Sequence, residues 1–162
     1  MTKDWLYRNM DEIILNDHNK AEYPPMHSAE HILNQTMVRL FGCKRSVSTH
    51  IERKKSKCDY FIDQEPKHDQ IKEIENKVND TIKQNLPVTI SFVNRGEVPE
   101  KVDLSKLPED ASNTVRIVTI GGYDVCACIG SHVKNTSEIG TFRIISTDYS
   151  DSRLRIRFKL EN

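Results

Sequence analysis

The amino-acid sequence predicts an α+β fold, with a mostly antiparallel sheet and two main helices packed against one of its faces. Apolar residues recur at helical spacing in two segments before residue 86, and the remainder is rich in alternating segments separated by turn residues. With 162 residues, of which 36% are hydrophobic and 30% charged, the chain suits one globular domain, residues 1–162. Residues 1–22 form an N-terminal extension to which the sequence assigns no role.

The first helix is expected to start at Tyr23-Pro24-Pro25-Met26, because proline is tolerated in the first turn of a helix. It should run to Phe41 and stop at Gly42. Its core face comprises Ile32, Leu33, Met37, Leu40 and Phe41. Ahead of it, Asp4 to Leu15 fit either a helix or an edge strand, because their apolar residues have no clear period.

The second helix is expected from Lys67 to Asn85, with Pro87 closing it. The residues that recur there at helical spacing are Ile71, Ile74, Val78 and Ile82. Immediately afterwards, Val88 to Phe92 alternate between apolar and polar residues, which predicts a strand.

Two hairpins should complete the sheet. Thr114 to Ile120 and Tyr123 to Cys128 flank Gly121-Gly122, a two-residue hairpin signal. Phe142 to Thr147 and Arg153 to Leu160 should pair across Ser150-Asp151-Ser152. In the last strand one face carries Leu154, Ile156, Phe158 and Leu160, and the other carries Arg153, Arg155, Arg157 and Lys159.

Bulk properties narrow the function classes. The formal net charge is zero, so attraction to nucleic acid must come from a local basic patch. No apolar run approaches the ~20 residues needed to cross a bilayer, and the N-terminus lacks a signal-peptide core, so we expect a cytoplasmic protein. Four cysteines are too few for a disulfide framework, and Cys43 and Cys58 are expected to be small core residues.

Histidine and cysteine spacing predicts a metal site. His27 and His31 lie four residues apart on a predicted helix, which turns roughly 400° over that distance and places both imidazoles on one face. Cys128 and His132 are also four residues apart, where a strand runs into a glycine-containing loop. Imidazole and thiolate ligands suit tetrahedral Zn²⁺. Cys126 faces the same side of an extended strand as Cys128, so spacing leaves both open as the fourth ligand.

The segment from His27 to His31 also fits His-x-x-Glu-His, the inverted zinc-protease motif, in which Glu30 would be the general base. Two observations disfavour a protease. Such motifs take a third ligand from a carboxylate on another helix, whereas the partners here are Cys128 and His132. The chain is also short for a peptide cleft with its own substrate domain.

Two segments together resemble a known family. His27-Ser28-Ala29-Glu30-His31-Ile32-Leu33, followed by the run from Cys128 to Gly140, is similar to the editing domain of alanyl-tRNA synthetase and to its short free-standing relatives, the AlaX-type proteins. The editing domain of threonyl-tRNA synthetase is a more distant relative. Thr141 to Ile144 also fit, and His50 to Tyr60 resemble the family's strand-loop-strand, so the resemblance covers Pro24 to the C-terminus.

This resemblance implies a fold of the second-additional-domain type and one zinc ion per chain. The zinc ligands that it implies are His27, His31, Cys128 and His132. It also implies hydrolysis of the ester between a wrong amino acid, chiefly serine and sometimes glycine, and the terminal ribose of alanine tRNA. The alternative is a non-catalytic, zinc-stabilised module that binds tRNA or another ligand. Monomer and homodimer are both left open.

Three positions depart from the family pattern and lie in its substrate pocket. Glu30 stands where the family has a small residue or threonine. Arg53 stands in place of a glutamine, and an Arg53–Glu30 ion pair would close the pocket. The family loop Cys-Gly-Gly-Thr-His reads Cys128-Ile129-Gly130-Ser131-His132, which keeps a hydroxyl at Ser131 but adds bulk beside Gly130.

Ester hydrolysis needs an activated water and stabilisation of the developing oxyanion. We assign catalytic roles to Glu30 and Ser131 and favour zinc as an ion that positions and polarises the substrate. The water would then be oriented by Glu30, by Ser131 or by the tRNA ribose. The version in which Cys128 is a loose ligand and water joins the ion stays open.

A basic stretch is expected to hold the tRNA 3′ end through phosphate contacts. It comprises Lys44, Arg45, Arg53, Lys54, Lys55 and Lys57, opposed only by Glu52. Lys134 and the stripe of Arg153, Arg155 and Arg157 would extend it.

Overall fold

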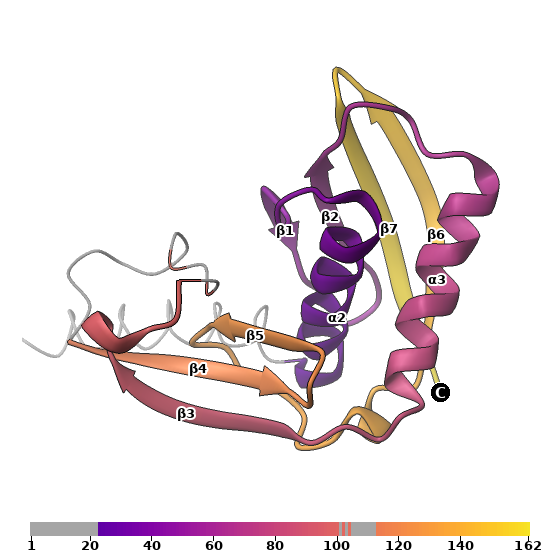
Figure 1. Cartoon of the computed structure of the whole chain (residues 1–162). Helices are drawn as coiled ribbons and strands as arrows, with labels where there is room; N and C mark the ends of the chain where they lie inside the picture. Colours follow the sequence, from indigo (N-terminus) through magenta and orange to yellow (C-terminus); the bar gives the residue numbers. More distant parts are fainter. Residues whose placement is uncertain (1–22, 101, 103, 105–112) are drawn as a thin grey trace, which may run out of the picture.

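The computed structural model describes residues 23–100, 102, 104 and 113–162 (Figure 1). They form two long helices and two antiparallel sheets, which confirms the predicted α+β class. The segment from Asp4 to Leu15 lies outside the described residues. Among the described helices, none is long and apolar enough to cross a membrane.

The strands divide into two sheets instead of the single sheet expected. The larger sheet has the order β1 (Ser48–His50), β2 (Ser56–Phe61), β7 (Arg153–Glu161) and β6 (Thr141–Ser150). The smaller sheet has the order β3 (Val88–Asn94), β4 (Thr114–Ile120) and β5 (Asp124–Ala127). Two 3-10 helices, η1 (Arg95–Glu97) and η2 (Thr136–Glu138), lie in the connections. In Figure 1 the smaller sheet extends sideways from the base of the larger one.

Helix α2 (Pro24–Phe41) has the predicted bounds and joins the two sheets. Proline occupies its first turn, and Gly42 ends it in the left-handed conformation with a φ of 65°. The predicted core residues Ile32, Leu33 and Met37 are fully buried, and Leu40 and Phe41 are half-buried. The polar residues buried on the same helix are Ser28, Glu30, His31, Asn34 and Thr36. Buried polar groups need hydrogen-bond partners, so the surroundings of these side chains are of interest. Ser28, Glu30 and His31 lie in the N-terminal half of the helix.

Helix α3 (His68–Ile82) is shorter than the predicted Lys67 to Asn85. Its C-terminal extension turns aside at Asn85, which has a positive φ of 55°. Ile74 and Val78 face the main core, against Phe142, Ile156 and Phe158 of the larger sheet and the buried side of α2. Asn79 fixes the helix to the sheet, because its amide bonds both the N–H and the C=O of Phe142 at 2.8 and 2.9 Å.

Both predicted hairpins form, with different turns. Ile120 pairs with Asp124, so the first turn holds three residues, Gly121 to Tyr123, instead of two. Tyr123 leaves the strand because its hydroxyl bonds Thr36 Oγ1 on α2 at 2.6 Å. In the second hairpin Ser150 pairs with Arg153, and the two turn residues between them have φ values of 54° and 61°, as a type I′ turn requires.

Candidate metal centre

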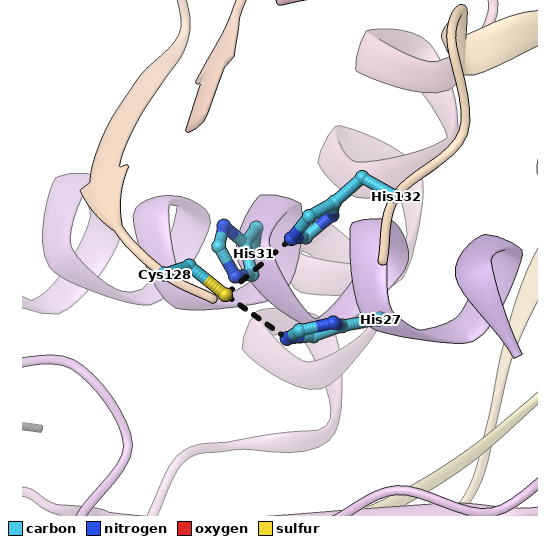
Figure 2. Close-up of side chains that lie close together, drawn as sticks. All are labelled: His27, His31, Cys128 and His132. Carbon is cyan, nitrogen blue, oxygen red and sulfur yellow. Dashed lines mark hydrogen bonds between the residues drawn. The ribbon is translucent and has the colours of Figure 1, made fainter. Parts of the chain in front are cut away.

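The structure brings together His27, His31, Cys128 and His132 (Figure 2). The first two project from successive turns of α2, Cys128 follows directly after β5, and His132 lies in the loop beyond it. One ligand atom from each residue lies within 4.8 Å of those of the other three. A helix and a loop from distant parts of the chain therefore converge on one point.

The distances suit a single tetrahedral ion. Cys128 Sγ lies 3.5 Å from His27 Nε2 and 3.5 Å from His132 Nε2. Bond lengths of about 2.3 Å to sulfur and 2.0–2.1 Å to nitrogen separate two tetrahedral zinc ligands by about 3.5 Å. Three imidazoles and one thiolate are also a donor set that zinc prefers. The residues present therefore fit the metal that the sequence indicates.

The two neighbouring cysteines have different environments. Cys126 pairs with Val118 inside β5 and its thiol contacts the Ala127 carbonyl, whereas Cys128 lies past the end of the strand and joins the cluster. Burial raises the pKa of Cys126 to about 12. Burial also opposes ionisation of Cys128, but contacts with His132, His27 and His31 outweigh it and lower the Cys128 pKa to about 3. Cys128 is thus a thiolate at neutral pH, the form that binds metal.

Each histidine has a contact at its second ring nitrogen, and sequence reasoning missed two of these partners. Ser28 Oγ lies 3.0 Å from His132 Nδ1 and also accepts the Val133 N–H at 3.2 Å. Asp124 Oδ2 lies 3.6 Å from His31 Nδ1, just beyond hydrogen-bond distance. His27 Nδ1 faces the Ser131 carbonyl oxygen at 3.3 Å. Such contacts fix the orientation of metal-binding imidazoles.

Burial and charged neighbours have opposing effects on the pKa values of His31 and Asp124. Burial disfavours its imidazolium, but contacts with Asp124 and Cys128 outweigh that effect and raise the His31 pKa to about 9. Burial similarly opposes ionisation of Asp124, yet His31 and Arg45 lower its pKa to about 2. Burial lowers the pKa of His132 to about 4. The metal-free cluster therefore carries mixed charges in a confined space.

Gly130 supports the cluster by its lack of a side chain. A Cβ atom there would lie 2.1 Å from His27 Cε1, closer than atoms can approach. Arg116 Nη1 donates to the carbonyl oxygens of Cys128 and Gly130 at 2.7 and 2.8 Å and so braces the loop. Ile129, between them, is 75% exposed. Space for a side chain is therefore lacking at Gly130, whereas the side chain of Ile129 is exposed to solvent.

Glu30 is buried beside the cluster, with 5% of its surface exposed. Its Oε1 accepts from Asn34 Nδ2 at 2.9 Å and faces Thr49 Oγ1 at 3.4 Å. Its Oε2 lies 3.7 Å from His31 Nε2 and 3.9 Å from His27 Nε2, the nitrogens that face the common point. One oxygen is therefore anchored and the other is directed at the cluster.

The expected Arg53–Glu30 ion pair is absent from the ion pairs of the described residues. Arg53 is exposed, and its guanidinium lies over the Tyr23 ring, 4.6 Å from the centroid. Glu30 is instead held by neutral groups of α2 and β1. Glu30 and Arg53 therefore have separate partners.

Comparisons with known proteins relate the chain to threonyl- and alanyl-tRNA synthetases. The family described as the threonyl and alanyl tRNA synthetase second additional domain matches residues 115–157. An alanine–tRNA ligase of Borreliella afzelii is 30% identical over 135 residues, and one of Methanococcus vannielii is 31% identical over 140 residues. Each match covers 83% of this chain. This chain is a relative of the alanyl-tRNA synthetase editing domain.

This editing-domain relative spans only a small part of those ligases. The match covers 23% of the Borreliella enzyme and 15% of the Methanococcus vannielii enzyme. A ligase of Methanococcus maripaludis shows the same proportion, at 29% identity and 15% coverage. The similarity therefore concerns one region of a larger protein.

The basic residues expected to contact tRNA differ in this editing-domain relative, because the lysines reach solvent and Arg45 is paired inside the protein. Lys44, Lys54, Lys55 and Lys134 are exposed, and Lys57 is half-buried. Arg45 differs, because its Nη1 and Nη2 bond the two carboxylate oxygens of Asp124 at 2.6 and 3.2 Å. Its positive charge is therefore paired with the carboxylate of Asp124, and a phosphate contact of Arg45 stays a prediction.

The arginine stripe of β7 is similarly occupied. Arg153 and Arg155 both bond the buried carboxylate of Asp59, at 2.7 and 2.8 Å. Arg157 bonds Asp148 at 2.6 Å across the hairpin. The stripe therefore stabilises the larger sheet through ion pairs and offers less free positive charge than its sequence indicates.

Proposed function

We propose that this chain is a zinc-dependent hydrolase that deacylates mischarged tRNA, with seryl- or glycyl-tRNA(Ala) as substrate. The observation that carries the proposal is the three-histidine, one-cysteine cluster with the free oxygen of Glu30 directed at it. The relationship to alanine–tRNA ligases supports the choice of an aminoacyl ester on tRNA.

In this proposal the four cluster residues hold the ion, which when bound supplies Lewis-acid polarisation and a fixed point for the substrate's polar groups. Glu30 Oε2 takes a proton from the attacking water as its oxygen bonds the ester carbonyl carbon. As the ester C–O bond breaks, Glu30 returns the proton to the departing ribose oxygen. Ser131, next to His132, orients the water with its hydroxyl.

Residues around the cluster shape the pocket. Ile129 is exposed next to Cys128 and is free to contact the aminoacyl group. Gly130 lets His27 approach the loop, and Arg53 on Tyr23 lines the start of α2. The terminal phosphates of tRNA contact the exposed residues Lys44, Lys54, Lys55 and Lys134 and the half-buried Lys57.

A second candidate function is a non-catalytic, zinc-stabilised module that binds tRNA. Four protein ligands complete a tetrahedral site, which is typical of structural zinc. In this version Glu30 only orders α2 and β1 through Asn34 and Thr49. The module binds tRNA but does not cleave the ester.

Deacylation assays separate the two. Seryl-, glycyl-, alanyl- and threonyl-tRNA are each incubated with wild type, His27→Ala and Glu30→Gln, with Glu73→Gln, at an exposed position of α3, as the control. The hydrolase hypothesis expects cleavage of seryl- or glycyl-tRNA(Ala) that His27→Ala abolishes. Glu30→Gln should lower the rate by about 10²–10⁴-fold while zinc content is unchanged. Binding of tRNA without cleavage of any of the four would support the module, and equal rates for wild type and His27→Ala would refute zinc-dependent hydrolysis.

A further inference from the structure

We propose that Asp124, held by Arg45, is a positioning residue for His31 that fixes the orientation of the His31 ring and thereby sets the metal affinity of the cluster. The inference rests on the proposed metal site but not on hydrolysis. The proposal is tested by metal affinity and the hydrolase proposal by deacylation. Either proposal can therefore fail while the other holds.

The geometry is that of a clamped carboxylate. Asp124 is 1% exposed at the start of β5. Its Oδ1 accepts from Arg45 Nη1 at 2.6 Å and from Gln35 Nε2 at 3.0 Å, and its Oδ2 accepts from Arg45 Nη2 at 3.2 Å. A two-pronged bond to arginine leaves the carboxylate little freedom to rotate. Asp124 Oδ2 is thereby held 3.6 Å from His31 Nδ1.

His31 needs such a partner. Among the described residues, its Nδ1 is the buried side-chain nitrogen that has no hydrogen bond. An N–H at this position and the carboxylate attract each other, which leaves the lone pair of Nε2 toward the cluster. The other two rings face uncharged oxygens, those of Ser131 and Ser28. His31 is thus the ring of the three whose second nitrogen faces a carboxylate.

The Arg45–Asp124 pair also joins the segment that follows α2 to the smaller sheet, so a purely structural role must be separated from positioning. Arg39 provides the matched control. It bonds the Tyr123 carbonyl oxygen at 2.9 Å and lies 4.2 Å over the Tyr123 ring. It therefore ties α2 to the same hairpin turn, one residue before Asp124, without bonding Asp124. Its contact with the clamp is indirect, from Arg39 Nε to Gln35 Oε1 at 3.3 Å.

The test is competition for Zn²⁺ between the protein and a chromophoric chelator. The variants are Asp124→Asn, Arg45→Gln, the double variant and the control Arg39→Gln. We expect Asp124→Asn to weaken zinc binding by about 10–100-fold, as loss of an outer partner does. Arg45→Gln should weaken it in the same direction, and the double variant should lose no more than Asp124→Asn, because both act through one contact. Arg39→Gln should retain wild-type affinity.

A second readout reports the ring itself. In ¹⁵N-labelled, zinc-loaded wild type, His31 should show a protonated Nδ1 that shifts in Asp124→Asn and stays in place in Arg39→Gln. Wild-type zinc affinity in folded Asp124→Asn, or an equal loss in Arg39→Gln and Arg45→Gln, would overturn the proposal. If Asp124→Asn does not fold, the comparison of Arg45→Gln with Arg39→Gln decides it.

Discussion

At the residue scale, two cysteines separated by one residue differ in charge at neutral pH, because Cys128 is a thiolate and Cys126 is a neutral thiol. The Cys128 pKa is lowered to about 3 and the Cys126 pKa is raised to about 12. Because the pKa of Cys128 is depressed, its thiolate persists as the pH falls until about 3, whereas Cys126 stays protonated throughout the neutral range. The charge difference follows from position, since only Cys128 lies past the end of β5 among the three imidazoles.

We therefore expect selective alkylation of metal-free protein at about pH 5, where Cys128 is a thiolate and the other thiols are not. Mass spectrometry after iodoacetamide treatment should find the label on Cys128. Loading with zinc should protect it. Label on Cys126 in preference to Cys128 would contradict the assignment.

Gly130 gives a second test at this scale. Gly130→Ala should weaken zinc binding by at least about tenfold, the size expected when the support of a ligand is lost. The reason is the 2.1 Å approach of the new Cβ to His27 Cε1. Gly122→Ala is the control, because a Cβ at Gly122 has no atom within 4 Å. Equal zinc affinity in the two variants would show that the loop moves freely away from His27.

At the element scale, α2 combines core and site. Its apolar residues fill the main core while Glu30, His31 and Asn34 are buried on the same helix. Tyr60 and Ser46 bond the Asn34 side-chain oxygen, and Asn34 in turn holds Glu30. The helix therefore needs the larger sheet to order the polar groups that face the cluster.

The joint between α3 and β6 makes a prediction about stability. Asn79→Ala removes both hydrogen bonds to the Phe142 backbone and should lower the free energy of unfolding by about 1–3 kcal/mol. Asn76→Ala, on the exposed side of α3, should change it little. Urea denaturation followed by circular dichroism measures both. A similar midpoint for the two variants would mean that apolar packing and the bond from the Ile144 N–H to Glu75 hold the helix without Asn79.

The elements themselves follow largely from local sequence. Helical periodicity and Gly42 predict α2 within one residue, and alternation predicts β7 with Leu154, Ile156 and Phe158 buried. The division into two sheets depends on which strands pair over long distances, which periodicity does not specify. Tyr123 shows the same limit, because its contact with Thr36 on α2 lengthens the hairpin turn.

The site residues likewise include some that local sequence predicts and others that only the tertiary structure brings together. Spacing at i and i+4 brings His27 and His31 to one helix face, but it leaves Cys126 and Cys128 equivalent until the end of β5 is known. Ser28, next to His27, is accessible to sequence reasoning as an outer partner. Asp124 is not, because tertiary packing alone brings it to His31 and Arg45.

At the scale of the whole molecule, zero net charge coexists with exposed lysines on the β1–β2 connection. If Lys54 and Lys55 contact phosphates, replacing both with alanine should weaken tRNA binding and reduce the slope of log K against log salt by about 2. The pair Lys72 and Lys77, exposed on α3, gives a control with the same change in charge. Equal effects of the two double variants would indicate only a general loss of charge.

The cluster is the point at which the two halves of the chain meet, since α2 supplies two of its residues and the loop after β5 supplies the others. The most direct test of this account is X-ray absorption spectroscopy of the zinc-loaded protein, with metal analysis of the same sample. We expect one zinc per chain, bound by one sulfur and three imidazole nitrogens, and loss of the sulfur signal in Cys128→Ser but not in Cys126→Ser. Two sulfur ligands, or a spectrum unchanged in Cys128→Ser, would contradict the proposed centre.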